Sequence, residues 1–325
     1  MSNTAASDTP LANSRVILSA GTLTRASFRE RVAAASSAGF NAISLFPQQY
    51  LAARRKERLS TEDMLAILSE HRISIDEIDP LLDWFGPGAS TSELLMTEMA
   101  EIFGARSINA AAAFVSDRSL EEIADCFSRL CSRLATLGLR VDLEFLPWTG
   151  VDKLATALQV LEMADQPNGG VMFDCWHFFN SGDSLEDLRE LDQDQAARIT
   201  SLQLNDVPHS IPRLDRRQNW LYTKIMLQSM IDSIRVLSFS AFRDVALKAS
   251  YPHPQAQKMM KDALCSRLYP DEGVNPIGEV LSILQEKGAR PAIGLEVFNL
   301  DHEALSPEQI ARRAMQAYRN CLPRA

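Results

Sequence analysis

Three short apolar runs, Val141-Asp-Leu-Glu144, Val171-Met-Phe-Asp174 and Ser201-Leu-Gln-Leu204, follow one another along the chain. Each run carries a polar residue at or near its end: Glu144, Asp174 and Gln203. These residues are separated by 30 and 29 positions. One strand, one helix and their two loops need about 30 residues, so the spacing predicts successive βα units. The three polar side chains should then meet at the carboxyl end of a parallel sheet.

The same alternation continues on both sides of these runs. Strands are predicted at residues 15–20, 42–46, 73–79, 107–114, 140–146, 170–174, 199–204 and 292–298. Helices are predicted at residues 28–38, 64–68 (with a cap at Ser60 or Thr61), 92–103, 119–138, 151–163, 184–191, 278–286 and 306–322. Eight βα units in order indicate an α/β protein with a (β/α)8 TIM barrel. An open, doubly wound sheet is the alternative.

The domain organisation follows from this pattern. Residues 1–14 are small and polar and are expected to form a disordered arm. Residues 15–325 are expected to form a single TIM-barrel domain. Within it, residues 207–271 interrupt the spacing after strand seven and carry a helical insertion. Such an insertion is a lid, a substrate wall or an oligomer contact, or else a surface helical hairpin that only thickens the fold.

Composition narrows the classes of partner. The 325 residues have a formal net charge of −9, which argues against a nucleic-acid or anionic-membrane surface. The five cysteines match neither a disulfide framework nor a zinc pattern, so a reducing cytoplasm is expected. No run of 18 apolar residues is present. The expected partner is a small-molecule substrate, with a homo-oligomer as a further expectation.

A fourth polar residue ends an apolar run near the C-terminus, Glu296 in Ile293-Gly-Leu-Glu296. Carboxylates in apolar strands are costly unless they are paired or bound to a metal. Four oxygen donors at the same barrel end suit a hard divalent cation such as Mn²⁺ or Mg²⁺.

Several motifs resemble one family. Val171-Met-Phe-Asp-Cys-Trp-His177 resembles the Asp-x-x-His signature of the xylose isomerase-like superfamily of sugar phosphate isomerases and epimerases. The segments 202–206, 267–273 and 293–299 resemble the family's last motifs, in the right order. The N-terminal half of the chain matches the family only in its alternation of strands and helices. Two positions depart from the family pattern: Gln203 stands where many members have histidine, and Asp271 where glycine is usual.

The resemblance implies a set of roles. One divalent metal would be bound by Glu144, Asp174, Gln203 and Glu296. Mn²⁺ or Mg²⁺ is expected because glutamine is a harder ligand than histidine, with Co²⁺ and Zn²⁺ as alternatives. The catalytic residues would be Glu144, Glu296 and His177. Candidate substrate-binding residues are His177, Arg267, Asp206, Trp148 and Trp176, with His209 as a further residue of the mouth. For Arg267, an ordinary surface position is the competing interpretation. The run Trp176-His-Phe-Phe179 suggests an apolar wall beside the site.

Four functions remain open from the sequence. The first is a metal-dependent isomerase or epimerase of a sugar, polyol or hydroxy-carbonyl compound that works through a metal-stabilised enediolate. The second is a metal-dependent dehydratase of a cyclic polyhydroxy compound such as a dehydroshikimate- or inosose-like substrate. The third, an abasic-site endonuclease, would need a histidine-rich metal cluster and a basic groove, and the chain has only five histidines. The fourth is a barrel that binds a ligand without catalysis.

Overall fold

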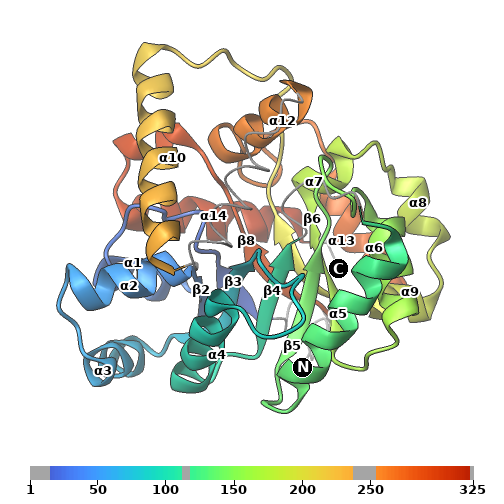
Figure 1. The fold of residues 1–325 in the computed structure, drawn as a ribbon. Helices are drawn as coiled ribbons and strands as arrows, with labels where there is room; N and C mark the ends of the chain where they lie inside the picture. The colour runs from blue at the N-terminus through green and yellow to red at the C-terminus, as the bar shows by residue number, and fades with distance from the viewer. Residues whose placement is uncertain (1–14, 112–117, 237–253, 323–325) are drawn as a thin grey trace, which may run out of the picture.

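The computed structural model describes residues 15–111, 118–236 and 254–322 (Figure 1). Eight parallel strands close into a barrel in chain order, and β1 pairs with β8. The strands are β1 (Val16–Leu18), β2 (Ala42–Leu45), β3 (Ser74–Leu81), β4 (Ser107–Ala111), β5 (Arg140–Glu144), β6 (Gly169–Asp174), β7 (Ile199–Leu204) and β8 (Ala292–Leu295). The predicted TIM barrel is therefore confirmed. The arm predicted at residues 1–14 lies outside the described residues.

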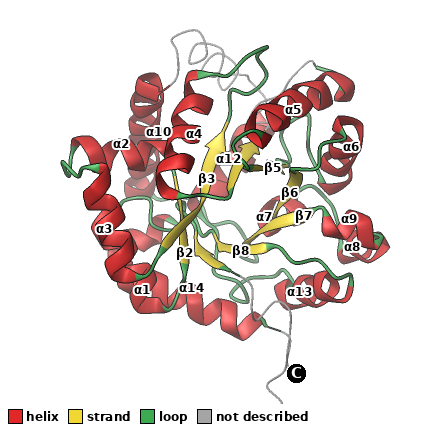
Figure 2. Cartoon of the chain, turned by 90° about the horizontal axis from the view of Figure 1, so that it is seen from below, coloured by secondary structure: helices red, strands yellow, loops and turns green. Residues whose placement is uncertain are grey.

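Helices surround the strands, as Figure 2 shows. They are α1 (Phe28–Ala38), α2 (Pro47–Arg55), α3 (Thr61–His71), α4 (Thr91–Phe103), α5 (Leu120–Ala135), α6 (Leu154–Ala164), α7 (Cys175–Asn180), α8 (Leu185–Glu190), α9 (Gln193–Ala197), α10 (Arg216–Val236), α12 (Pro254–Cys265), α13 (Ile277–Glu286) and α14 (Pro307–Cys321), with a short 3₁₀ helix η2 (Leu300–Ala304).

Local sequence explains where the main helices begin. Ser27, Ser60, Ser119 and Ser306 each accept a hydrogen bond from the third helical backbone N–H in a capping box. This arrangement satisfies backbone donors that the first turn leaves without a partner. The predicted cap of the second amphipathic helix is thus Ser60.

Two short helices at the carboxyl ends of strands were not predicted. Helix α2 begins at Pro47, directly after β2, and α7 begins at Cys175, directly after β6. Both are too short for the period of apolar residues to identify them. Helix α7 matters most for function, because the side chain of Asp174 caps it by accepting a hydrogen bond from the backbone N–H of His177.

The insertion after β7 contains α10 and α12. Figure 1 shows both helices beyond the barrel on the side of α7, at the carboxyl ends of the strands. Helix α10 packs against α2, α4 and η2. These elements follow β2, β3 and β8, respectively. The insertion therefore lies over the loops that build a TIM-barrel site. Within the described ranges, no helix is both long and apolar enough to cross a bilayer.

The barrel interior holds a buried acid below the site. Glu77 is 3% exposed, and its Oε2 accepts a hydrogen bond from Ser201 Oγ at 3.0 Å. Burial, and then the neighbouring Asp142 carboxylate, raise the pKa of Glu77 to about 8. The folded state thus binds this proton more tightly than the unfolded chain does. The resulting stabilisation is complete below the unfolded pKa and is lost as the pH rises through about 8.

Replacing Glu77 with glutamine should remove this pH dependence. Between about pH 5 and about pH 8, the wild type should lose roughly 3 kcal/mol of unfolding free energy that Glu77→Gln does not lose. Urea unfolding across this pH range would measure the shift, with Glu286→Gln on the surface as the matched control. Parallel stability profiles for the wild type and Glu77→Gln would contradict the assignment.

Candidate active site

The four residues expected to bind a metal lie at adjacent strand ends. Glu144 and Asp174 are the last residues of β5 and β6, Gln203 is the penultimate residue of β7, and Glu296 follows β8 directly. The register places Asp174 beside Gln203, and Gln203 beside Gly294. All four side chains are buried, and none belongs to a residue more than 7% exposed.

Arg267 lies among these side chains. Its Nη1 donates to Asp174 Oδ2 at 2.6 Å and to Glu296 Oε2 at 3.2 Å. The guanidinium carbon also lies 6.0 Å from the ring centre of Trp176 and 5.3 Å from that of Phe298. Arg267 is only 2% exposed, so it is part of the barrel mouth and not an ordinary surface arginine.

His177 joins the cluster from α7. Its Nε2 lies 3.4 Å from Glu144 Oε1 and 3.4 Å from Arg267 Nη2. The edges of Trp148 and Trp176 confine the ring, with both ring centres 5.4 Å from that of the imidazole. Because Asp174 caps the backbone of His177, the two residues of the Asp-x-x-His motif are held in one rigid turn.

The amide of Gln203 faces two carboxylates. The terminal atom turned toward them lies 2.9 Å from Asp174 Oδ2 and 3.1 Å from Glu296 Oε2. With its nitrogen in this place, Gln203 donates a hydrogen bond to each carboxylate. With its oxygen there, the amide oxygen faces two carboxylate oxygens, an arrangement that a cation held among them would stabilise. The same side chain can therefore serve the site with or without an ion.

Two further residues extend the acidic cluster. Asn109 Nδ2 donates to Asp79 Oδ1 at 2.7 Å and to Glu144 Oε2 at 2.8 Å. Asp79 is 4% exposed, and burial followed by the charges of Glu77 and Glu144 raises its pKa well above the usual range. Neither Asn109 nor Asp79 was among the predicted site residues. Asp79 nonetheless ends the predicted third strand, which is the same signal that identified Glu144.

The electrostatics of the cluster follow from burial and from Arg267. Burial raises the pKa of Glu296 well above its ordinary value, although Arg267 opposes this shift. Burial alone would also raise the pKa of Asp174, but the charges of Arg267 and His177 hold it below its ordinary value. Four buried carboxyl groups (Asp79, Glu144, Asp174 and Glu296) thus surround one guanidinium in the described part of the mouth.

This donor set fits a divalent cation. Ligand atoms of Glu144, Asp174 and His177 lie within 4.8 Å of one another, and Gln203 and Glu296 adjoin Asp174. Carboxylate and amide oxygens are typical ligands of Mn²⁺ and Mg²⁺. An ion held there would also offset the excess of negative charge that raises the pKa of Glu296.

The carboxylate of Asp206, an expected substrate-binding residue, is engaged by backbone groups of the protein. Its Oδ1 accepts from the backbone N–H groups of Val207 (2.7 Å) and Asn275 (2.9 Å), and its Oδ2 accepts from that of Gly273 (2.9 Å). A Cβ at Gly273 would lie 2.3 Å from the carbonyl oxygen of Val207, so only glycine allows this approach. The contacts assign Asp206 to holding this loop, and we do not include it in the proposed site. Asp271, in the same loop, has a φ of 69°, the conformation that glycine favours.

The aromatic residues after β6 are mostly core. Phe178 is fully buried and packs against Phe173, with ring centres 4.7 Å apart. Trp176 is 1% exposed and contacts the site through His177 and Arg267. Trp148 is half-buried beside His177. The apolar wall expected beside the site is therefore formed by Trp148 and Trp176, because α7 turns Phe178 toward the core. His209 lies exposed in the loop after β7.

Comparison with known proteins identifies relatives of this chain. A curated relative, an inosose isomerase of Halalkalibacterium halodurans, is 24% identical over 179 residues, which cover 54% of this chain and only 46% of the relative. Among solved structures, the IOLI protein with a bound zinc atom superposes with a TM-score of 0.70 at 16% identity, over 95% of this chain and 98% of that one.

A probable 3-DHS dehydratase, AsbF of Bacillus anthracis, superposes with a TM-score of 0.63 at 18% identity, over 94% of this chain and 99% of that one. At such identities, these structures show the shared fold alone. The sequence profile of the xylose isomerase-like TIM barrel family matches residues 32–321. This match covers most of the chain and includes every residue of the cluster. The protein therefore belongs to the xylose isomerase-like TIM barrel family.

Proposed function

We propose that this protein is a divalent-metal-dependent isomerase or epimerase of a sugar, polyol or related hydroxy-carbonyl compound. The observation that carries the proposal is that ligand atoms of Glu144, Asp174 and His177 lie within 4.8 Å of one another, while Gln203 adjoins both Asp174 and Glu296. Arg267 pairs with the same two carboxylates, Asp174 and Glu296. The family match, an inosose isomerase relative and the fold shared with a probable 3-DHS dehydratase support an enzyme that acts on a small molecule.

Some residues of the site would bind the substrate, and others would transfer protons. A divalent ion held by the four ligands would polarise the neighbouring hydroxyl and carbonyl oxygens of the substrate. Glu144 ends β5 and Glu296 follows β8, and each can take or return a proton at the hydroxyl-bearing carbon next to the carbonyl. Arg267 and His177 supply donors for substrate oxygens, and the tryptophans beside His177 exclude water.

Dehydration is the second candidate for the same site. His177 Nε2 lies 3.4 Å from Glu144 Oε1, so an acid is held next to a base. An imidazolium in this place can protonate a departing hydroxyl after Glu144 has removed a proton from the adjacent carbon. The structural similarity to the probable 3-DHS dehydratase supports keeping this candidate.

Solvent exchange would test the proposal and separate the two candidates. Protein with added Mn²⁺ would be incubated in D₂O with a panel of ketoses, inososes and cyclic hydroxy-ketones, and followed by proton NMR. Deuterium incorporation beside the carbonyl without loss of water would support isomerisation, whereas an absorbing enone would support dehydration. If no compound of the panel undergoes exchange or elimination, the proposal is contradicted. Glu144→Gln and Glu296→Gln should abolish the exchange.

Gln203 should set the metal preference. An imidazole is a softer ligand than an amide oxygen, so Gln203→His should shift the preference from Mn²⁺ toward Zn²⁺. We expect the ratio of the two dissociation constants to change by about tenfold, or 1.4 kcal/mol. Competition titration with both metals measures this ratio. An unchanged ratio would show that Gln203 does not bind the ion.

A further inference from the structure

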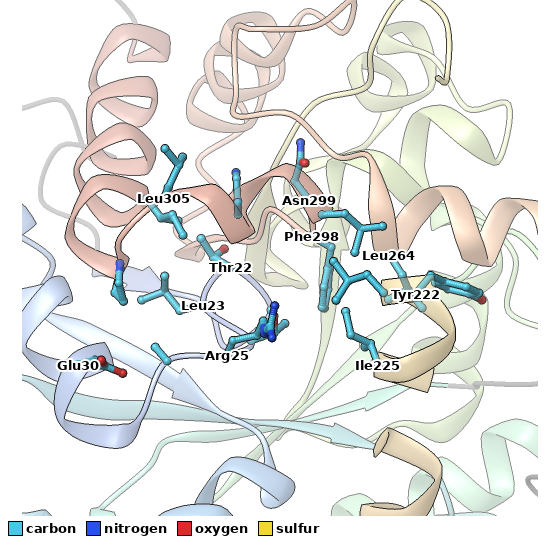
Figure 3. A pocket seen from close by; sticks show the side chains of 18 residues that line it. Thr22, Leu23, Arg25, Glu30, Tyr222, Ile225, Leu264, Phe298, Asn299 and Leu305 are labelled. Carbon is cyan, nitrogen blue, oxygen red and sulfur yellow. The ribbon is translucent and has the colours of Figure 1, made fainter. Parts of the chain in front are cut away.

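A cavity of about 430 Å³ lies between the barrel and the insertion (Figure 3). Its walls come from the loop after β1, the start of α1, the segment after β8 with η2, the start of α14, and the two helices of the insertion. Most of the lining is apolar: Leu23 from the first loop, Leu221 and Ile225 from α10, Leu264 from α12, and Leu305 after η2. In Figure 3, Glu30 lies at the opposite side of the cavity from Tyr222 and Ile225.

Several polar groups that line the cavity are already engaged within the protein. Thr22 Oγ1 donates to the carbonyl of Leu295 and accepts from the N–H of Val297. The Asn299 amide donates to the carbonyl of Arg267 and accepts from the N–H of Asp301. Burial lowers the pKa of His302 to about 4, which keeps this imidazole uncharged at neutral pH. Thr24, Arg25, Glu30 and Tyr222 add polar groups to the lining, but apolar side chains supply most of it, so the cavity offers much apolar surface to a hydrocarbon group.

Phe298 connects the cavity with the cluster. It lines the cavity and lies two residues after Glu296, with its ring over the guanidinium of Arg267. Gly21 allows the ring to occupy this place, because a Cβ there would lie 2.4–2.9 Å from three atoms of the Phe298 ring. A ligand in the cavity would therefore contact the same side chain that covers Arg267.

We propose that this cavity binds an apolar, ring-sized group of the substrate, while the polar end of the substrate lies at the acidic cluster. The inference rests on the proposed function and deepens it, because it assigns the substrate to hydroxy-carbonyl compounds that carry an aromatic or branched alkyl substituent. The cavity volume lies within the range of small-molecule pockets, about 300–1,000 Å³. Burial of apolar surface between α10 and the barrel then supplies binding energy away from the reacting atoms.

Hydroxamates provide the test, since their two oxygens chelate divalent metals and their tails can be varied. Binding of acetohydroxamate and of phenylalkyl hydroxamates with progressively longer linkers would be measured by calorimetry on the Mn²⁺-loaded protein. We expect the best phenylalkyl compound to bind at least about tenfold more tightly than acetohydroxamate. Ile225→Trp, which fills the cavity, should remove this gain and leave acetohydroxamate binding unchanged. Leu227→Trp, on the same helix but 51% exposed at this position, should retain the gain.

Leu305→Trp fills the cavity from the opposite wall. It replaces Ile225→Trp in the test if thermal unfolding shows that Ile225→Trp does not fold. The inference alone is overturned if acetohydroxamate binds but no phenylalkyl compound gains affinity, or if both cavity-filling variants keep the gain. If acetohydroxamate itself fails to bind, the proposed function falls, and the inference falls with it.

Discussion

Asp174→Asn should abolish metal-dependent activity, lowering kcat/KM at least about 10³-fold, because it removes a charged ligand at the centre of the cluster. Metal affinity should fall by roughly 3 kcal/mol, about two orders of magnitude. Asparagine keeps the shape of the side chain and can still accept the hydrogen bond from the backbone N–H of His177, so α7 should remain capped. Calorimetric Mn²⁺ titration and turnover would measure the two losses.

Asp76→Asn is the matched control. Asp76 is also a buried strand carboxylate, 5% exposed, but it pairs with Arg15 near the start of β3, at the other end of the barrel. It should lose stability without losing metal affinity. If Asp76→Asn weakened Mn²⁺ binding as much as Asp174→Asn, the effect would come from general destabilisation and not from loss of a ligand.

Arg267→Met should change stability, metal affinity and activity in different directions. Loss of the guanidinium leaves Asp174 and Glu296 without their buried partner, so the metal-free protein should lose roughly 3 kcal/mol of unfolding free energy. The guanidinium and a metal ion compete for the same two carboxylates, so Mn²⁺ affinity should rise about tenfold. Turnover should nevertheless fall, because a donor to substrate oxygens is gone.

Thermal unfolding with and without Mn²⁺, together with kinetics, separates these effects. The metal should stabilise Arg267→Met more than it stabilises the wild type. Arg133→Met provides the comparison, since Arg133 pairs with Glu93 at 2.6 Å outside the barrel mouth. The Arg133→Met variant should lose stability, and Mn²⁺ should not restore it. Equal responses of the two variants to Mn²⁺ would argue against competition at the cluster.

The strand ends were predictable because two simple regularities coincide. Side chains such as Glu144 and Asp174 close apolar runs, and the constant spacing brings the carboxyl ends of successive strands together. Neither regularity depends on the details of packing. Asp79 carries the same signal at the end of β3, and its omission reflects the motif resemblance, which covered only the C-terminal half of the chain.

Other parts of the site depend on tertiary structure. Arg267 follows α12 after a long insertion, and neither spacing nor periodicity determines where such a residue points. The turn into α7 places Phe178 in the core. This could not be predicted, because a six-residue helix is too short to show a periodicity in the sequence. Leu221 and Ile225 line a cavity only because α10 packs back over the loops after β2 and β8. Long-range packing of this kind cannot be read from local sequence.

The central claim is that oxygens of Glu144, Asp174, Gln203 and Glu296 share one divalent cation. Diffraction from crystals grown with Mn²⁺, recorded at a wavelength where manganese scatters anomalously, tests this claim most directly. We expect a single strong anomalous peak among these four side chains, with the guanidinium of Arg267 displaced from Asp174. A map with no peak there, and with Arg267 still bound to both carboxylates at saturating Mn²⁺, would contradict the claim.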